Sequence, residues 1–319
     1  MTGAALNLWL VGIGVGGVAL AGALSWWSHG ARPWRRLAAR IVAAPVLLLA
    51  VYCLWYRFRP WPTPRHWKPH PAVTVQVLTR DAPRPVVLSV ATVDLDHPGL
   101  ELVLSEPAAD GQFAARTTEQ FADEQGLQLA VNAQFFTPFS STHPMQFYPQ
   151  TGELVRAVGF AASDGATISA QQWRGAILYF DRDGRGSATA PDAVWDAVGG
   201  RNVLVTDGEA QPLADKGTAP RVGLGLDPAG RTLIIAVVDG RQPGYSEGMT
   251  LPELAALMAE LGAHDAIELD GGGSAALVVR DGEDLAVINT PIHTRIPGRL
   301  RPVASNLGIR FSGPSEPAG

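Results

Sequence analysis

The chain has 319 residues, room for one large domain or two modest ones, and a formal net charge of −5. Residues 1–70 contain eight of the 25 Lys and Arg residues and no acidic residue, so the remainder holds 17 basic and 30 acidic side chains, a balance of −13. This acidity argues against nucleic acid as a partner, because it would repel the phosphate backbone. The single cysteine, Cys53, excludes an internal disulfide and a cysteine-rich metal site.

Two apolar runs within residues 1–60 predict a pair of transmembrane helices, at about residues 7–27 and 41–56. The first run contains no ionisable residue and is long enough to cross a bilayer. The second is short for a span, but the flanking Arg40 and Arg57 can extend outward to the headgroups. A single anchor from the second run is the alternative. A secretory signal peptide fits poorly, because no basic region precedes the first run.

The basic residues around these helices set the expected orientation. Four arginines lie between the two runs and four basic residues follow the second, so a simple count does not decide. Only the N-terminus is basic before the first helix, which favours a cytoplasmic connecting loop. We therefore expect a membrane protein, in contact with lipid through these helices, whose large domain lies on the periplasmic or extracellular side. Repeated prolines in residues 61–72 predict a stiff, extended linker to that domain.

Residues 73–312 are predicted to form one domain, followed by a flexible tail at residues 313–319. Short alternating runs such as residues 74–78 and 87–93 are typical of strands, and turn-forming Gly, Asp and Pro separate them. Strands outnumber helices along this region. The expected fold class is therefore mixed α+β with a large β-sheet, preceded by the transmembrane helical hairpin.

Two helix starts can be placed from capping boxes in this domain. Thr117 with Gln120, and Thr250 with Glu253, have the spacing at which a hydroxyl and a longer polar side chain satisfy each other's backbone amides. The second pair precedes an apolar stripe at helical spacing, which predicts an amphipathic helix that packs on the sheet.

The most specific motif is a run of three glycines, Gly271, Gly272 and Gly273, directly after a predicted buried strand. Without side chains, their amides can approach a ligand closely and can form an anion-binding concavity. Ser274 adds a hydroxyl at the exit of this loop. Taken alone, the segment could also be a tight hairpin turn.

Four further motifs accompany the glycine loop: Asn132-Ala-Gln-Phe-Phe136, Arg221-Val-Gly-Leu-Gly-Leu-Asp227, Asp239-Gly-Arg241 and Arg301-Pro-Val. Their order over roughly residues 73–311 resembles that of the phosphodiester glycosidase family. The resemblance implies a glycosidase that removes a sugar from a glycosyl phosphodiester, in carbohydrate metabolism of the cell envelope or of extracellular glycans such as exopolysaccharide. No cofactor is expected from the sequence, with calcium left open. The chain departs from the family pattern in two places: Glu268 stands where the family has Asn, and Ala133-Gln134 replace two glycines.

The reaction expected from this resemblance sets requirements for the site. Cleavage of a glycosyl phosphodiester passes through an oxocarbenium-like state, so the site should hold phosphoryl oxygens and place a carboxylate near the anomeric carbon. We expect Asp270 to act as nucleophile or general base and Arg221 to be the leading phosphate ligand. Glu268 shares a strand face with Asp270 and could divide acid and base work with it, or raise its pKa. A turn-capping Asp270 and an ion-paired Arg221 are the structural alternatives.

Further residues are predicted to bind substrate. Arg301 and Arg241 are the second and third candidates for the phosphate, and His293 is a possible acid near neutral pH. Asn132 could bond the substrate or satisfy the core. The full set of substrate-binding candidates is Asn132, Asp239, Arg241, Gly271, Gly272, Gly273, Ser274, His293 and Arg301.

No convincing metal cage is evident in the sequence, although the loop carboxylates Asp181, Asp183 and Asp207 leave calcium open. The expected partner is a glycan or glycosyl-phosphate substrate. The alternative function is a non-catalytic glycan-binding module at the cell surface, which the departures at Glu268 and Gln134 would favour.

Overall fold

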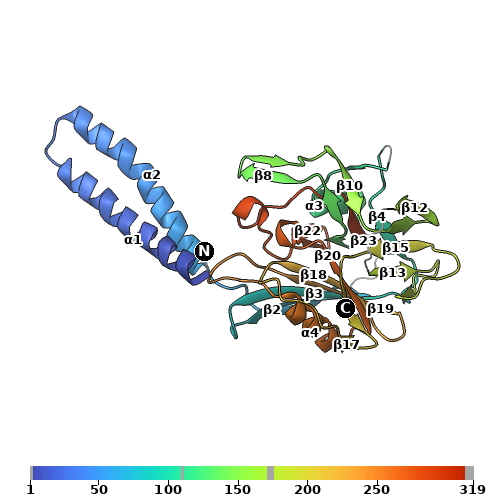
Figure 1. The fold of residues 1–319 in the computed structure, drawn as a ribbon. Coiled ribbons are helices and arrows are strands. Elements are labelled where there is room, and N and C mark those ends of the chain that lie inside the picture. Colours follow the sequence, from blue (N-terminus) through green and yellow to red (C-terminus); the bar gives the residue numbers. More distant parts are fainter. Residues whose placement is uncertain (1–2, 109–110, 171–175, 313–319) are drawn as a thin grey trace.

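The computed structural model describes residues 3–108, 111–170 and 176–312, and the tail expected at residues 313–319 lies outside this part of the chain. Two long helices, α1 (Gly3–Trp27) and α2 (Pro33–Phe58), form an antiparallel hairpin that projects from a β-rich domain (Figure 1). Both are long and apolar enough to cross a membrane. A Cβ added to Gly17 would lie 2.8 Å from the Cβ of Ala50, so a small residue allows the helices to approach closely.

Helix α2 begins earlier than expected and the linker is shorter. Pro33 opens α2 at a position where its missing N–H costs nothing, and the arginines after it continue the helix to the apolar run. At the other end, residues 65–70 do not belong to a free linker. They form β1 (Arg65–His70), which pairs with β2 (Val73–Arg80) at the edge of the main sheet. Trp67 packs against the core and anchors this segment, so the irregular spacer is limited to residues 59–64.

The main sheet has eight strands in the order β1-β2-β3-β19-β18-β20-β16-β17 and is antiparallel throughout. Its strands beyond β2 are β3 (Val86–Asp94), β19 (Thr232–Val238), β18 (Arg221–Leu226), β20 (Asp265–Leu269), β16 (Val203–Thr206) and β17 (Glu209–Ala210). Helix α4 (Leu251–Glu260) covers one face and buries Leu254, Leu257 and Met258 there. The capping box predicted at Thr250 and Glu253 opens this helix.

The opposite face of the main sheet packs against a second, five-stranded sheet. Its order is β22 (Asp284–Val287), β21 (Leu277–Asp281), β6 (Leu129–Asn132), β23 (Asn306–Phe311) and β4 (Leu100–Leu104). The principal core lies between the two sheets, where Val131 and Leu277 meet Leu224 and Ile235 in one apolar cluster. Helix α3 (Thr118–Glu124) covers the far side through Phe121, and its predicted capping box at Thr117 is present.

Three smaller sheets complete the domain. One joins β5 (Phe113–Ala114), β10 (Leu154–Val158) and β7 (Phe135–Thr137). Another joins β12 (Ala166–Ser169), β11 (Ala161–Ser163), β15 (Asp196–Gly199), β13 (Ile177–Phe180) and β14 (Gly186–Ser187). The third is the hairpin of β8 (Ser140–His143) and β9 (Gln146–Tyr148), which projects from the domain (Figure 1). The domain is a mixed, β-rich α+β fold, as predicted.

Candidate active site

Asp270 lies where the two large sheets meet. It follows β20 of the main sheet, its N–H donates to the carbonyl of Ala133 at 2.9 Å, and its carbonyl accepts from Asn132 Nδ2 at 2.6 Å. Asn132 Oδ1 accepts from the N–H of Ala276 at 3.0 Å. The fully buried Asn132 amide therefore holds both ends of the glycine loop, which is the core role rather than the substrate-binding role considered for it.

The glycine loop, residues 271–273, brings bare backbone against two guanidinium groups. A Cβ on Gly273 would lie 2.4 Å from Arg301 Nη2, and one on Gly272 would lie 3.1 Å from Arg241 Nη1. Gly272 also has a φ of +62°, which favours glycine. Gly271 and Gly272 are partly exposed, so this segment is open to a ligand.

The carboxyl group of Asp270 is almost enclosed by protein. Burial raises its pKa to about 6, and Glu268 raises it further, whereas the Ser274 hydroxyl, Arg301 and Arg241 act in the opposite direction. A carboxyl group with this pKa is mostly ionised at neutral pH and still basic enough to accept a proton. Arg301 and Arg241 are therefore two guanidinium groups that act on the carboxylate of Asp270.

Arg301 is fixed on several sides. Its Nε donates to His293 Nδ1 and its Nη1 to Ser274 Oγ, both at 3.1 Å, while its guanidinium lies 4.2 Å from the centre of the Phe139 ring. Burial lowers the pKa of Arg301 to about 10, so the group remains charged at neutral pH. A charged, preorientated guanidinium beside Asp270 is suited to phosphoryl oxygens.

His293 does not have the properties expected of a neutral-pH acid. The residue is fully buried, and burial, followed by Arg301 and Arg299, lowers the pKa of its imidazole to about 3. The neutral ring accepts from Arg301 at Nδ1, which places its proton on Nε2. Its role here is to orient Arg301.

Arg221 and Glu268 form a buried ion pair. Arg221 Nη1 lies 3.0 Å from Glu268 Oε1, and the two side chains are only 12 % and 4 % exposed. The other Arg221 nitrogens donate to the carbonyls of Met249 and Gly217, each at 3.1 Å, and Asn202 donates to the second oxygen of Glu268. This geometry favours the ion-pair alternative for Arg221 over the role of leading phosphate ligand. It also occupies Glu268, whose negative charge is matched by Arg221.

Asp239 and Arg241 follow β19 and have different surroundings. The carboxylate of Asp239 is buried and accepts from Asn289 Nδ2 at 3.0 Å and from the N–H of Thr290 at 2.9 Å, so it holds a loop rather than facing a ligand. Burial raises the pKa of Asp239 to about 6. Arg241 has an exposed side chain beside Gly272, and Asp270 attracts its guanidinium. Arg241 is therefore open to a ligand in a way that Asp239 is not.

The hairpin β8–β9 supplies a wall that the sequence did not predict. Phe147 packs edge-on against His293 with ring centres 4.5 Å apart, and Arg299 lies 4.6 Å from the centre of the Phe147 ring. Arg299 Nη1 also donates to the carbonyl of Pro144 at 2.6 Å. The concentration of arginines at positions 295, 299 and 301 was the available signal, since it stands out in an acidic domain.

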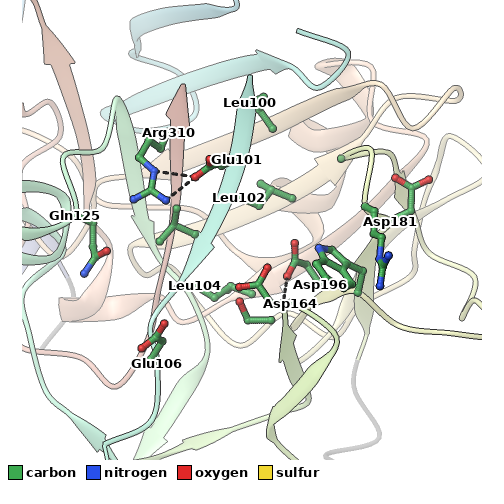
Figure 2. A pocket seen from close by; sticks show the side chains of 15 residues that line it. Leu100, Glu101, Leu102, Leu104, Glu106, Gln125, Asp164, Asp181, Asp196 and Arg310 are labelled. Carbon is green, nitrogen blue, oxygen red and sulfur yellow. Dashed lines mark hydrogen bonds and ion pairs between the residues drawn. The ribbon is translucent and has the colours of Figure 1, made fainter. Parts of the chain in front are cut away.

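Two cavities lie elsewhere in the domain. One, of about 230 Å³, is lined by acidic side chains that include Glu101, Asp164 and Asp196; Figure 2 shows Glu101 bonded to Arg310, and Asp164 beside Asp196. The other, of about 600 Å³, lies between β13 and β20. Neither lining contains Asp270 or the glycine loop. We place the candidate site at Asp270 because the convergence of charged groups and bare backbone there matches the required chemistry.

The loop carboxylates considered for calcium are not gathered around one point. Within the described ranges, no group of three or more His, Cys, Asp or Glu side chains is arranged to hold a metal ion. Asp181 Oδ1 accepts from the amides of Asp183 and Arg185 in its own turn, and Asp207 lies 3.8 Å from His264.

Solved structures of other proteins share this fold. The chain is similar to a hypothetical protein from Synechocystis, with 14 % identity and a TM-score of 0.56 over 79 % of this chain and 64 % of that one, slightly under two thirds of its length. It is similar to the catalytic domain of zebrafish N-acetylglucosamine-1-phosphodiester alpha-N-acetylglucosaminidase, auto-inhibited by its pro-peptide, with 21 % identity and a TM-score of 0.53 over 80 % and 86 %. The search of the curated proteins finds no match.

The family assignment comes from the sequence match. The phosphodiester glycosidase family model matches residues 125–310, more than half of the chain. This range contains Asn132, the Arg221–Glu268 pair, Asp270 and Arg301. The chain belongs to the phosphodiester glycosidase family.

Proposed function

We propose that this protein hydrolyses a glycosyl phosphodiester at the site formed by Asp270, the glycine loop and two arginines. Arg301 and Arg241 bind the phosphoryl oxygens, together with amides of residues 271–273. The observation that carries the proposal is the convergence of a buried carboxylate, two guanidinium groups and bare backbone at one partly exposed loop.

The chemical step needs little help with the leaving group. As the bond between the anomeric carbon and the phosphate oxygen breaks, the electron pair leaves on the phosphate, whose negative charge Arg301 stabilises. Ionised Asp270 either forms a bond to the anomeric carbon, which water later hydrolyses, or accepts a proton from the attacking water. Both routes yield a free sugar and a phosphate monoester. Glu268 acts neither as acid nor as base in this step, because Arg221 and Asn202 already hold its carboxylate.

We further propose that the helices α1 and α2 anchor this activity to a membrane. Their length and apolar composition support two spans, and the distribution of basic residues supports a large domain on the periplasmic or extracellular side. Envelope or extracellular glycans, exopolysaccharide among them, are then the accessible substrates.

A non-catalytic glycan-binding module is the second candidate. The engagement of Arg221 by Glu268 favours it, because a residue expected to bind phosphate is occupied by a neighbour that departs from the family pattern. Under this alternative the site binds a sugar phosphate but does not cleave it.

The experiment that separates these functions uses a matched pair of variants of the full chain in detergent micelles. Asp270→Asn changes the candidate catalytic carboxylate. Asp196→Asn changes another buried carboxylate whose pKa burial raises to about 6, but in the acidic cavity. Release of sugar from a panel of α-glycosyl phosphodiesters, including UDP-sugars, is measured together with binding of the same compounds.

We expect the parent and Asp196→Asn to release sugar, and Asp270→Asn to bind but not turn over. Loss of turnover in Asp196→Asn with full activity in Asp270→Asn would move the site to the acidic cavity. Binding without sugar release by the parent protein would establish the module instead.

A further inference from the structure

The end of helix α2 is docked onto the loop that carries Arg241. Arg59, the first residue after α2, donates to the side chain of Gln242, and its guanidinium lies 3.4 Å from the centre of the Tyr245 ring. Arg57 lies so close to Gly244 that an added Cβ would be 2.5 Å from Arg57 Nη1. The candidate membrane helix thus packs directly on the segment that follows β19.

This docking loop is itself rigidly held. Gln242 Nε2 donates to the carbonyl of Thr290 at 2.8 Å, and the Tyr245 hydroxyl lies 2.9 Å from Thr290 Oγ1. Asp239 accepts from the N–H of Thr290 and lies within electrostatic range of Arg59. These contacts join the helix end, the loop and Thr290, so the end of α2 is seated beside the segment that carries Arg241.

Two arginines, Arg295 and Arg241, lie between the end of α2 and the carboxylate of Asp270. Arg295 lies within electrostatic range of both Tyr56, near the end of α2, and Arg241. Arg241 in turn acts on Asp270. The active site therefore lies beside the end of the candidate membrane helix α2, and only residues 59–64 remain of the expected spacer.

Exposed apolar side chains gather on the same part of the domain. Phe139 is 43 %, Met145 78 % and Ile296 37 % exposed, and we call these three residues the apolar rim. Among the large hydrophobic residues of segments 73–108, 111–170 and 176–312, only Leu154 and Val203 are comparably exposed. Phe139 contacts Arg301, while Arg299 bridges the hairpin at Pro144 to the segment that carries Ile296. Figure 1 shows β8 projecting from the side of the domain that faces the helix hairpin.

The combination of groups defines a class of ligand. The apolar rim can contact hydrocarbon, the neighbouring arginines can hold a phosphodiester, and Asp270 faces the sugar beyond it. A water-soluble nucleotide sugar would leave the rim without a function. A long-chain alcohol whose phosphate lies at the headgroup level would contact the apolar rim with its hydrocarbon and the arginines with its phosphate.

We infer that the natural substrate is lipid-linked, a sugar joined through a phosphodiester to a long-chain alcohol that remains in the bilayer. This inference rests on the proposed hydrolase function and specifies its substrate. Cleavage breaks the bond between the anomeric carbon and the phosphate oxygen, water supplies the hydroxyl group of the released sugar, and the lipid monophosphate stays in the membrane.

The test uses the full chain reconstituted in phosphatidylcholine vesicles with two substrates of the same sugar and phosphate. One carries a long prenyl chain that inserts in the vesicle, and the other a short, water-soluble alkyl group. Met145→Glu and Ile296→Glu place charge on the apolar rim, and Val203→Glu is the matched control at an exposed valine outside it. Turnover of the short-chain substrate reports whether each variant is folded.

The parent protein is expected to cleave the prenyl substrate with a kcat/KM at least about tenfold higher than that for the short-chain substrate. Both rim variants should lose about tenfold on the prenyl substrate alone, and Val203→Glu should lose nothing. Equal cleavage of both substrates, or equal loss on both in the rim variants, would overturn the lipid-linked substrate and leave the hydrolase function intact. Cleavage of neither substrate by the parent would overturn both.

Discussion

Asp270 is almost completely buried and lies near two guanidinium groups, and both features determine the pKa of its carboxyl group. Burial raises the pKa of its carboxyl group from 3.8 to about 6, although Arg301 and Arg241 pull in the opposite direction. Since only the ionised form can act as nucleophile or base, kcat/KM should increase as the pH rises through about 6 and then level off. A pH–rate profile of the full chain checks this. A rising limb near pH 4, where an unperturbed carboxyl group titrates, would show that the acting group is not buried.

The charge and shape of Arg301 make separate contributions. Arg301→Gln removes the charge and should lower kcat/KM by about 100-fold or more, because phosphate stabilisation is greatest in the transition state. Arg301→Lys keeps the charge but loses the fork that contacts Ser274 and His293 together, so about tenfold should be lost.

Arg310→Gln is the matched control for Arg301. Arg310 pairs with Glu101 at the acidic cavity, and its loss should leave kcat/KM unchanged. Equal effects of the changes at positions 301 and 310 would contradict the assignment of the phosphate site.

At the scale of elements, the Arg221–Glu268 ion pair connects the neighbouring strands β18 and β20. Glu268→Ala leaves a buried guanidinium without its counter-charge and should lower the free energy of unfolding by about 3–5 kcal/mol. The double variant Arg221→Met, Glu268→Leu removes both charges and should recover much of that loss. Denaturant unfolding of the single and double variants measures the difference. Additive losses would show that the two side chains do not depend on each other.

Elements that neighbouring residues determine could be predicted from the sequence, whereas elements that depend on distant contacts could not. The capping boxes at Thr117 and Thr250 and the alternating strands were confirmed, because neighbouring residues determine them. The strand β1 was missed, since prolines obscure its alternation and its pairing with β2 depends on Trp67 reaching the core. The wall from hairpin β8–β9 was also missed, and an ion pair was considered for Arg221 without Glu268 as its partner. Both depend on contacts between segments far apart in the chain, which spacing within one motif does not encode.

At the scale of the whole molecule, buried carboxyl groups make stability depend on pH. The pKa of Asp239 is raised from 3.8 to about 6 by burial, so its contribution to stability is fully present below about pH 4 and is lost as the pH rises through about 6. Asp239→Asn cannot ionise. Relative to the parent, its free energy of unfolding should therefore gain about 3 kcal/mol between pH 4 and pH 8, from about two pKa units.

The comparison between variant and parent removes the contributions of other titrating groups, such as His293, which act equally in both proteins. Chemical unfolding of both proteins in the same micelles at the two pH values gives the difference. A difference that stays constant between pH 4 and pH 8 would show that Asp239 ionises as freely in the folded protein as in the unfolded chain.

The general arrangement of the molecule was predictable, but the relation between its two parts was not. Composition indicated two apolar helices, and the ordered motifs indicated the family to which the domain belongs. The prolines of residues 61–72 suggested a separating spacer, whereas Arg57 and Arg59 dock the helix end onto the loop beside the site. This contact is made by long side chains that reach from one segment to another, and no periodic pattern in the sequence predicts such contacts.

The most direct test of the central claim is a crystal structure of the full chain with a non-hydrolysable glycosyl phosphonate bound. The account predicts phosphonate oxygens against Arg301, Arg241 and the amides of residues 271–273, with the anomeric carbon facing Asp270. A phosphonate held by Arg221, or a ligand bound in the acidic cavity beside Asp196, would contradict it.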